Sequence, residues 1–212
     1  MNNFHIDSRL QTQLVDTYLD IIPLVRWNVL WFVVSIPIVT FIPATAGLYY
    51  VTNLLAHDRP VEWQDFFRGM RRYFWQSWLW GGMNFIAAIL IFSNAIYYSQ
   101  DSSIAAKIAR GVILVVAFLW VTIQVYLFPL LLEQEKPRLG LAFRNSLVLI
   151  LKRPIYSLGI TLVMVIVVLF STAFIWPVWM VITAAYCARL ANKATIQTIA
   201  KIRESKPPSK PS

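Results

Sequence analysis

The chain has 212 residues, of which 58% are hydrophobic and only 14% are charged, and its formal net charge is +9. Soluble domains carry about 25% charged residues, so this composition excludes an ordinary soluble protein. One cysteine and two histidines exclude an internal disulfide and a Cys/His zinc cluster, and no nucleic-acid-binding motif accompanies the positive charge.

Four long segments contain no charged side chain: 27–56, 73–100, 111–132 and 154–188. About 20 apolar residues cross a bilayer as a helix, and lipid requires every backbone polar group to be satisfied internally. The sequence therefore predicts an all-α, polytopic transmembrane helical bundle with about five spans and additional amphipathic interfacial helices. In this prediction, residues 1–192 form a single membrane domain.

The first apolar segment is preceded by an amphipathic pattern over 8–25, which predicts a helix at the membrane surface or in a groove of the bundle. Proline removes a backbone hydrogen bond and clashes with the preceding turn, so Pro37 and Pro43 predict a kink or break. We expect a first span over 24–42 with a helical continuation over 44–57.

The same segment carries a candidate structural or functional motif. Its members combine polar, helix-breaking and small side chains: Asn28, Ser35, Pro37, Thr40, Pro43, Ala44 and Gly47. We expect a break between residues 36 and 44 that packs against other helices, with Ala44, Ala46 and Gly47 in the closest helix contact. The alternative is a hinge or a substrate-facing gap.

Residues 62–74 predict an in-plane interfacial helix, because aromatic side chains share one helical face and arginines occupy the rest. The candidate docking residues are Trp63, Phe66, Phe67, Arg68, Arg71 and Arg72. This helix could dock a partner, or it could connect two spans while lying on lipid.

The remaining elements follow in order. We expect spans over 76–98 and 110–132, and a second amphipathic helix over 139–153. The long segment that follows predicts two short spans, 155–171 and 173–190, with a turn near Ser171, Thr172 and Pro177. Residues 193–212 form a basic cytoplasmic tail that begins as a short helix and has a disordered end.

The distribution of basic residues predicts the topology. With five spans, Arg9, Arg26, Lys107 and Arg110 lie on one side and the other fifteen of the 19 Lys and Arg lie opposite. The positive-inside rule then places the N-terminus outside the plasma membrane and the C-terminus in the cytoplasm. A six-span variant, in which the first segment crosses twice, also fits these charges.

No chemistry is indicated inside the spans. They contain neutral polar residues but no ionisable ones, and such residues either line a path or form hydrogen bonds between helices. The positions of five residues would discriminate between a polar path and hydrogen bonds between helices: Asn28, Ser35, Asn84, Asn94 and Gln124. We expect no catalytic residue, metal site or cofactor, and no enzymatic activity.

Residues 27–50 carry an asparagine, then Ser-x-Pro-x-Val-Thr, then Pro-Ala-Thr-Ala. This pattern resembles the YesL-like family of bacterial integral membrane proteins, a domain of unknown function. The resemblance continues through 65–68 and 126–130, and weakly at 143–146. It implies a small helical membrane protein encoded near genes of carbohydrate uptake and degradation, but no reaction or ligand.

Our primary functional hypothesis is a non-enzymatic accessory or scaffold protein of the plasma membrane, linked to carbohydrate uptake. Its partners would be the lipid bilayer and other membrane proteins such as a sugar importer, and not nucleic acid. The alternative is a small-solute permease or channel subunit. The sequence leaves the oligomeric state open.

Overall fold

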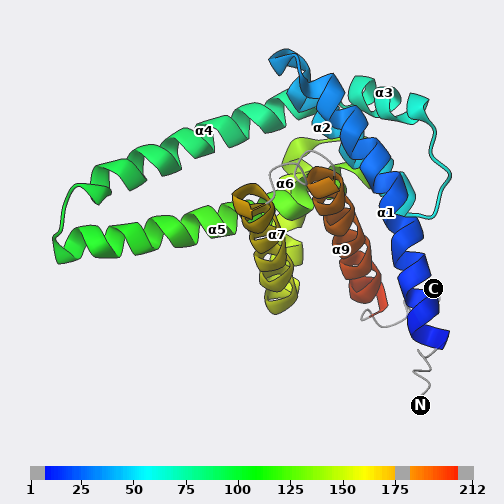
Figure 1. Ribbon diagram of the computed structural model, residues 1–212. Helices are drawn as coiled ribbons and strands as arrows, with labels where there is room; N and C mark the ends of the chain where they lie inside the picture. The colour runs from blue at the N-terminus through cyan, green and yellow to red at the C-terminus, as the bar shows by residue number, and fades with distance from the viewer. Residues whose placement is uncertain (1–7, 175–181, 205–212) are drawn as a thin grey trace, which may run out of the picture.

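The computed structural model describes residues 8–174 and 182–204, with side chains for residues 22–173 and 182–204. These residues form helices and no strand, which confirms the predicted all-α class (Figure 1). The helices are α1 (Ser8–Ser35), α2 (Ile38–Ala56), α3 (Trp63–Arg72), α4 (Phe74–Ser99), α5 (Ile104–Leu132), α6 (Leu139–Lys152), α7 (Pro154–Phe174) and α9 (Ala184–Glu204).

Four of the described helices are long and apolar enough to cross a bilayer: α2, α4, α5 and α7. The apolar part of α1, Ile22–Ser35, is shorter. The molecule is thus a helical protein with four candidate membrane spans among its described residues, as a polytopic membrane protein requires.

The first apolar segment is not one continuous helix over 24–42, and the break lies within the predicted range 36–44. Helix α1 ends at Ser35 and α2 begins at Ile38, with Pro37 in an extended conformation between them. A proline disfavours helical geometry in the residue before it, which favours a break at Pro37 but does not by itself distinguish Pro37 from Pro43. Pro43, the second predicted breaker, lies inside α2.

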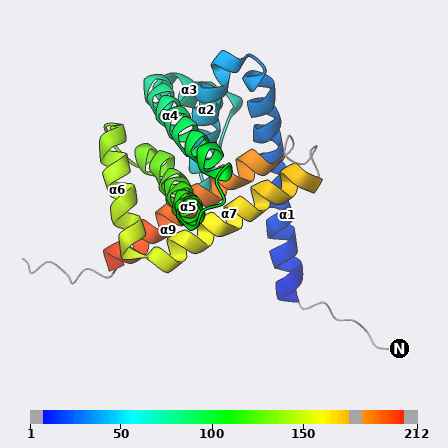
Figure 2. The ribbon, with the colours of Figure 1, turned by 90° about the vertical axis from the view of Figure 1, so that its left-hand side faces the viewer.

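The chain reverses direction at this break, and α1 and α2 lie side by side (Figures 1 and 2). Trp31 lies before the turn and contacts residues after it. Its Nε1 donates a hydrogen bond to Thr45 Oγ1 at 3.2 Å, and its ring lies 5.7 Å from that of Phe41. The two helices therefore form an antiparallel pair.

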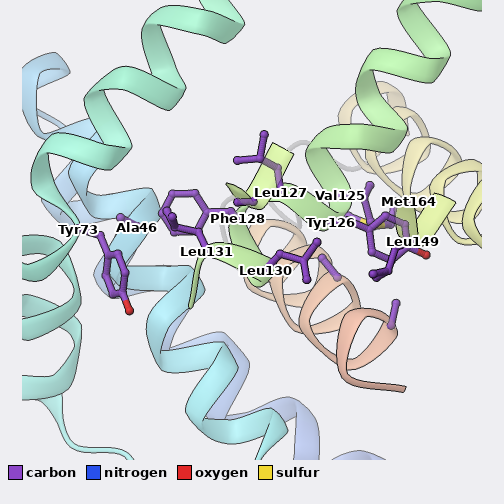
Figure 3. Close-up of a cluster of buried hydrophobic side chains, with 13 residues drawn as sticks. Ala46, Tyr73, Val125, Tyr126, Leu127, Phe128, Leu130, Leu131, Leu149 and Met164 are labelled. Carbon is purple, nitrogen blue, oxygen red and sulfur yellow. The ribbon is translucent and has the colours of Figure 1, made fainter. Parts of the chain in front are cut away.

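Two hydrophobic clusters hold the body of the protein together. One joins α1, α2, α3 and α9 and contains Trp27, Leu48 and Phe66. The other surrounds the end of α5, where Phe128 and Leu131 are fully buried (Figure 3). Helix α2 contacts α1, α3, α4, α5 and α9, so it is the central element of the fold.

Helices α4 and α5 project from this body as a long hairpin, whereas α7 and α9 run crosswise to it (Figures 1 and 2). The expected spans 76–98 and 110–132 lie within α4 and α5. The distal part of the hairpin has apolar side chains exposed along its length, including Phe85, Phe92 and Leu114. Lipid would cover such a surface in a membrane.

The C-terminal third differs in part from the expectation. Helix α7 continues through Ser171 and Thr172, where a turn was expected. Pro177 and the centre of the expected span 173–190 lie outside the described residues, as does the end of the tail after residue 204. The expected basic helix from 193 is part of α9.

Candidate functional site

The small residues of the first motif form a packing seam. Ala44, Ala46 and Gly47 are buried where α2 meets its neighbours. A Cβ atom added at Gly47 would lie 2.8 Å from both Met70 Cγ and the backbone oxygen of Phe66. Only a residue without a side chain permits this approach of α2 and α3.

Asn28 contributes a second interhelical contact from the same motif. Its side chain is fully buried, and its Oδ1 accepts a hydrogen bond from the backbone N–H of Ala185 at 2.7 Å. This bond ties α1 to the beginning of the described part of α9. Asn28 is therefore used in helix packing.

The break itself faces outward, which corrects the expectation that it packs against other helices. Ile38 is 89% exposed and Pro37 is exposed as well, because the turn lies at the tip of the α1–α2 pair. The Thr40 hydroxyl donates to the carbonyl oxygens of Pro37, at 2.7 Å, and of Val34. The Ser35 hydroxyl is buried without a hydrogen-bond partner among the described residues.

Helix α3 divides its aromatic residues between two surfaces, although the sequence pattern placed them on one face. Phe66 is completely buried against α2, whereas Trp63 is 65% exposed and Phe67 is exposed beside it. At the beginning of the helix, the Asp65 carboxylate accepts from the backbone N–H of Glu62 at 3.0 Å. Because Phe66 is buried, the residues available for docking are fewer than the sequence predicted.

The arginines of α3 also have different surroundings. Arg68 pairs with Asp65, while Arg71 and Arg72 are exposed and lie in no ion pair among the described residues. The Arg72 guanidinium lies 5.6 Å from the centre of the Tyr73 ring. Burial raises the pKa of the Tyr73 phenol, so this group stays neutral at physiological pH.

A polar network missed by the sequence reasoning joins α2, α5 and α9. Asn192 is fully buried and donates from Nδ2 to the Tyr49 carbonyl and to Thr52 Oγ1, each at 3.1 Å. Its Oδ1 accepts from Asn53 Nδ2 at 3.3 Å. Ala188, Ala191 and Ala194 surround Asn192 on the buried face of α9, and an asparagine among small buried residues is a signal for such a hub, since buried amides are usually hydrogen-bonded.

The network extends to a carboxylate near the surface. Asn53 Nδ2 donates to Glu133 Oε1 at 2.8 Å, and His57 Nε2 lies 2.9 Å from the same oxygen. His57 is the C-cap residue of α2. Its partner is 76 positions away in sequence, and no local pattern connects the two.

A cavity of about 380 Å³ adjoins this end of the network. Its polar lining consists of His57, Glu133, Gln134, Asn145 and Arg203, and aliphatic side chains of α5, α6 and α9 complete it. The size falls within the usual range for small-ligand pockets. The arrangement offers donors and acceptors to a small polar molecule at the end of the bundle.

Asn84, Asn94 and Gln124 lie on the α4–α5 hairpin. They are the remaining residues that discriminate a polar path from hydrogen bonds between helices. Gln124 Oε1 accepts from Trp80 Nε1 at 2.8 Å and from Asn84 Nδ2 at 3.2 Å, and Trp120 Nε1 donates to Asn84 Oδ1 at 3.2 Å. We call these four residues the hairpin clamp. Asn94 is exposed and donates only to the Leu90 carbonyl of its own helix, at 2.7 Å.

These features define a helical protein with candidate membrane spans. The amides of Asn28, Asn84, Gln124 and Asn192 join one helix to another, whereas most serine and threonine hydroxyls donate within their own helix. Within the described residues, no three His, Cys, Asp or Glu side chains are grouped to hold a metal ion. Residues 24–95 match the family model described as "Protein of unknown function, DUF624", which is consistent with the resemblance to the YesL-like family. No curated protein and no solved structure matches the chain.

Proposed function

We propose that this protein is a non-enzymatic accessory or scaffold protein of the plasma membrane. One observation carries the proposal: the amide side chains of Asn28, Asn192 and Gln124 form separate contacts between helices. Asn28 joins α1 to α9, Asn192 joins α9 to α2, and Gln124 joins α5 to α4. A transport path would require such groups to line one continuous cavity.

The outer surface of α3 is the proposed docking surface. Trp63 and Phe67 are exposed there beside Arg71, and aromatic and arginine side chains are enriched at interface hot spots. The resemblance to the YesL-like family suggests a partner that takes part in carbohydrate uptake, such as a sugar importer.

Site-specific photo-crosslinking in intact cells tests this proposal. A photoreactive amino acid at Phe67 should give a discrete crosslinked product with one membrane protein. The matched control is Leu147, which is exposed on α6. Equal products from both positions would contradict a docking role for α3.

A flux measurement separates the accessory role from the permease alternative, which the polar cavity beside Glu133 favours. Purified protein in liposomes should give no sugar or glycerol flux above protein-free liposomes. A saturable flux that Glu133→Gln reduces would support a permease or channel subunit and would overturn the accessory role.

For orientation, we propose that the C-terminus lies in the cytoplasm, as the fifteen-to-four distribution of basic residues favours. The five-span prediction places the N-terminus outside. The six-span variant, in which both termini are cytoplasmic, requires α1 to cross antiparallel to α2, and the apolar part of α1, Ile22–Ser35, is shorter than the four candidate spans. Reporter fusions at the N-terminus, at Ser102 and at Ser212 discriminate the two, since only the N-terminal reporter differs between them.

A further inference from the structure

A groove lies where α2, α3 and α4 meet, and it has a volume of about 500 Å³. Three helices contribute its lining: Val39, Thr40 and Pro43 from α2, Phe67, Met70 and Arg71 from α3, and Phe74 and Trp75 from α4. The volume falls within the range of pockets that hold whole small ligands.

The chemistry of the groove is asymmetric. Its walls are apolar or aromatic except for the Thr40 hydroxyl and the Arg71 guanidinium, and Arg71 is its one charged lining residue. The Thr40 hydroxyl already donates within the turn. An occupant that matches this surface has a long apolar part and a negative group at one end.

The position of the groove along α4 points to the same kind of occupant. Phe74 begins α4, a candidate span, and Trp75 is 74% exposed at its first turn. Tryptophan favours the membrane interface, and a basic residue immediately before a span lies at the level of the lipid head groups. Arg71 precedes α4 by three residues.

We propose that this groove binds an anionic phospholipid. One acyl chain lies against Val39, Pro43 and Phe74, and the phosphate pairs with the Arg71 guanidinium. The site depends on the membrane setting of α4. It shares Phe67 and Arg71 with the proposed docking surface of α3, so a partner bound there would compete with the lipid, and the lipid test is made without a partner protein. Charge complementarity favours this lipid over a zwitterionic one by about fivefold, the contribution of a single arginine near an anionic membrane surface.

Photoreactive phospholipids test the proposal on the full-length protein in nanodiscs. A diazirine on the acyl chain of phosphatidylglycerol should label peptides that contain 39–43 and 67–75, about fivefold more than the same probe on phosphatidylcholine. Arg71→Gln should reduce the phosphatidylglycerol labelling to the phosphatidylcholine level. The control is Arg144→Gln, an exposed arginine on α6 that should leave the labelling unchanged.

A second variant tests the apolar part of the site. Val39→Trp fills the groove from an exposed position and should reduce the labelling by both probes, while Val112→Trp on the exposed surface of α5 should not. Equal labelling of the wild type by the two probes would overturn the proposal. Labelling confined to other helices, or unaffected by Arg71→Gln, would overturn it as well.

Discussion

Helices α2 and α4 are both apolar candidate spans, but the structure uses them differently. In its most apolar window, 44% of α2 is buried inside the protein, whereas none of the corresponding window of α4 is buried. Hydropathy alone does not separate the two cases, because lipid and protein interior are similarly apolar. The difference must lie in other properties of the residues.

Side-chain size and amides account for the difference. Helix α2 buries Ala44, Ala46 and Gly47 and shares the amide network of Asn53 and Asn192. Small residues let backbones approach, and interhelical amides need partners, so both features mark protein–protein contact in a membrane. Among the described residues, the polar contacts of α4 with another helix are the three hydrogen bonds of the hairpin clamp, and α4 then extends away from the body.

Substitution of a glycine should give the largest difference between α2 and α4 in the free energy of unfolding. Gly47→Leu places side-chain atoms against the backbone oxygen of Phe66, which cannot move away without shifting α3. We expect a loss of about 3 kcal/mol in the free energy of unfolding. SDS titration of the purified protein, followed by circular dichroism, measures it.

Gly82→Leu on α4 is the matched control, because a Cβ there meets nothing within 4 Å. We expect its free energy of unfolding to change by less than about 1 kcal/mol. Equal losses in the two variants would show that α2 is not packed more tightly than α4.

Removal of an asparagine should have the next largest effect. Asn192→Ala removes three hydrogen bonds to α2, and each is worth about 0.6 kcal/mol in a membrane protein, so we expect a loss of about 2 kcal/mol. Asn94→Ala removes only a bond within α4 and should be nearly neutral. The same SDS titration compares the two variants. A neutral Asn192→Ala would contradict the role of Asn192 as a hub.

The sequence predicted the helical class because charge-free segments of this length have few other structures available in lipid. It also indicated the Gly47 seam, since small side chains have a direct steric consequence. Prolines were less informative. Pro37 and Pro43 were equivalent as local signals, but only Pro37 ends up in a break, and only the packing of α1 on α2 distinguishes them.

The polar network could not be predicted from local patterns. Glu133 meets His57 and Asn53 because α5 ends beside the end of α2, and this depends on how α5, α6 and α9 assemble. Whether an aromatic side chain of α3 is buried or exposed also depends on how the helices assemble. A helical face predicts which side chains share a direction, but not whether α2 or lipid covers them.

Loss of the hairpin clamp should have a smaller, local effect. Gln124→Leu removes the acceptor of Trp80 and Asn84, and we expect a loss of about 1 kcal/mol. Hydrogen–deuterium exchange should rise in α4 near these residues, while α2 serves as an internal control and should not change. Faster exchange in both helices would show that the hairpin and the body unfold together.

The smallest effect is expected at the tip of the hairpin, which tests whether the α4–α5 connection is held locally. Ser103 caps α5: its Oγ accepts from the Ala106 N–H at 3.2 Å, and its own N–H donates to Asp101 at 2.8 Å. Ser103→Ala should cost at most about 1 kcal/mol, measured as faster exchange in the first turn of α5. Ser102→Ala, an exposed neighbour, is the control and should change nothing.

The pH dependence of this tip follows from Asp101. Hydrogen bonds from the Ser103 N–H and hydroxyl lower the pKa of the Asp101 carboxyl below its ordinary value. A carboxyl with a lowered folded-state pKa stabilises the structure above the ordinary pKa of about 3.9 and loses that contribution as the pH falls through the lowered value.

The intrinsic exchange rate itself varies with pH, so each protection factor must be referred to an unstructured peptide at the same pH. Protection in the first turn of α5 should then be constant from pH 7 to pH 5 and fall only in stronger acid. A decline near neutral pH would show that the first turn of α5 is not held by the Asp101–Ser103 contacts of its own tip.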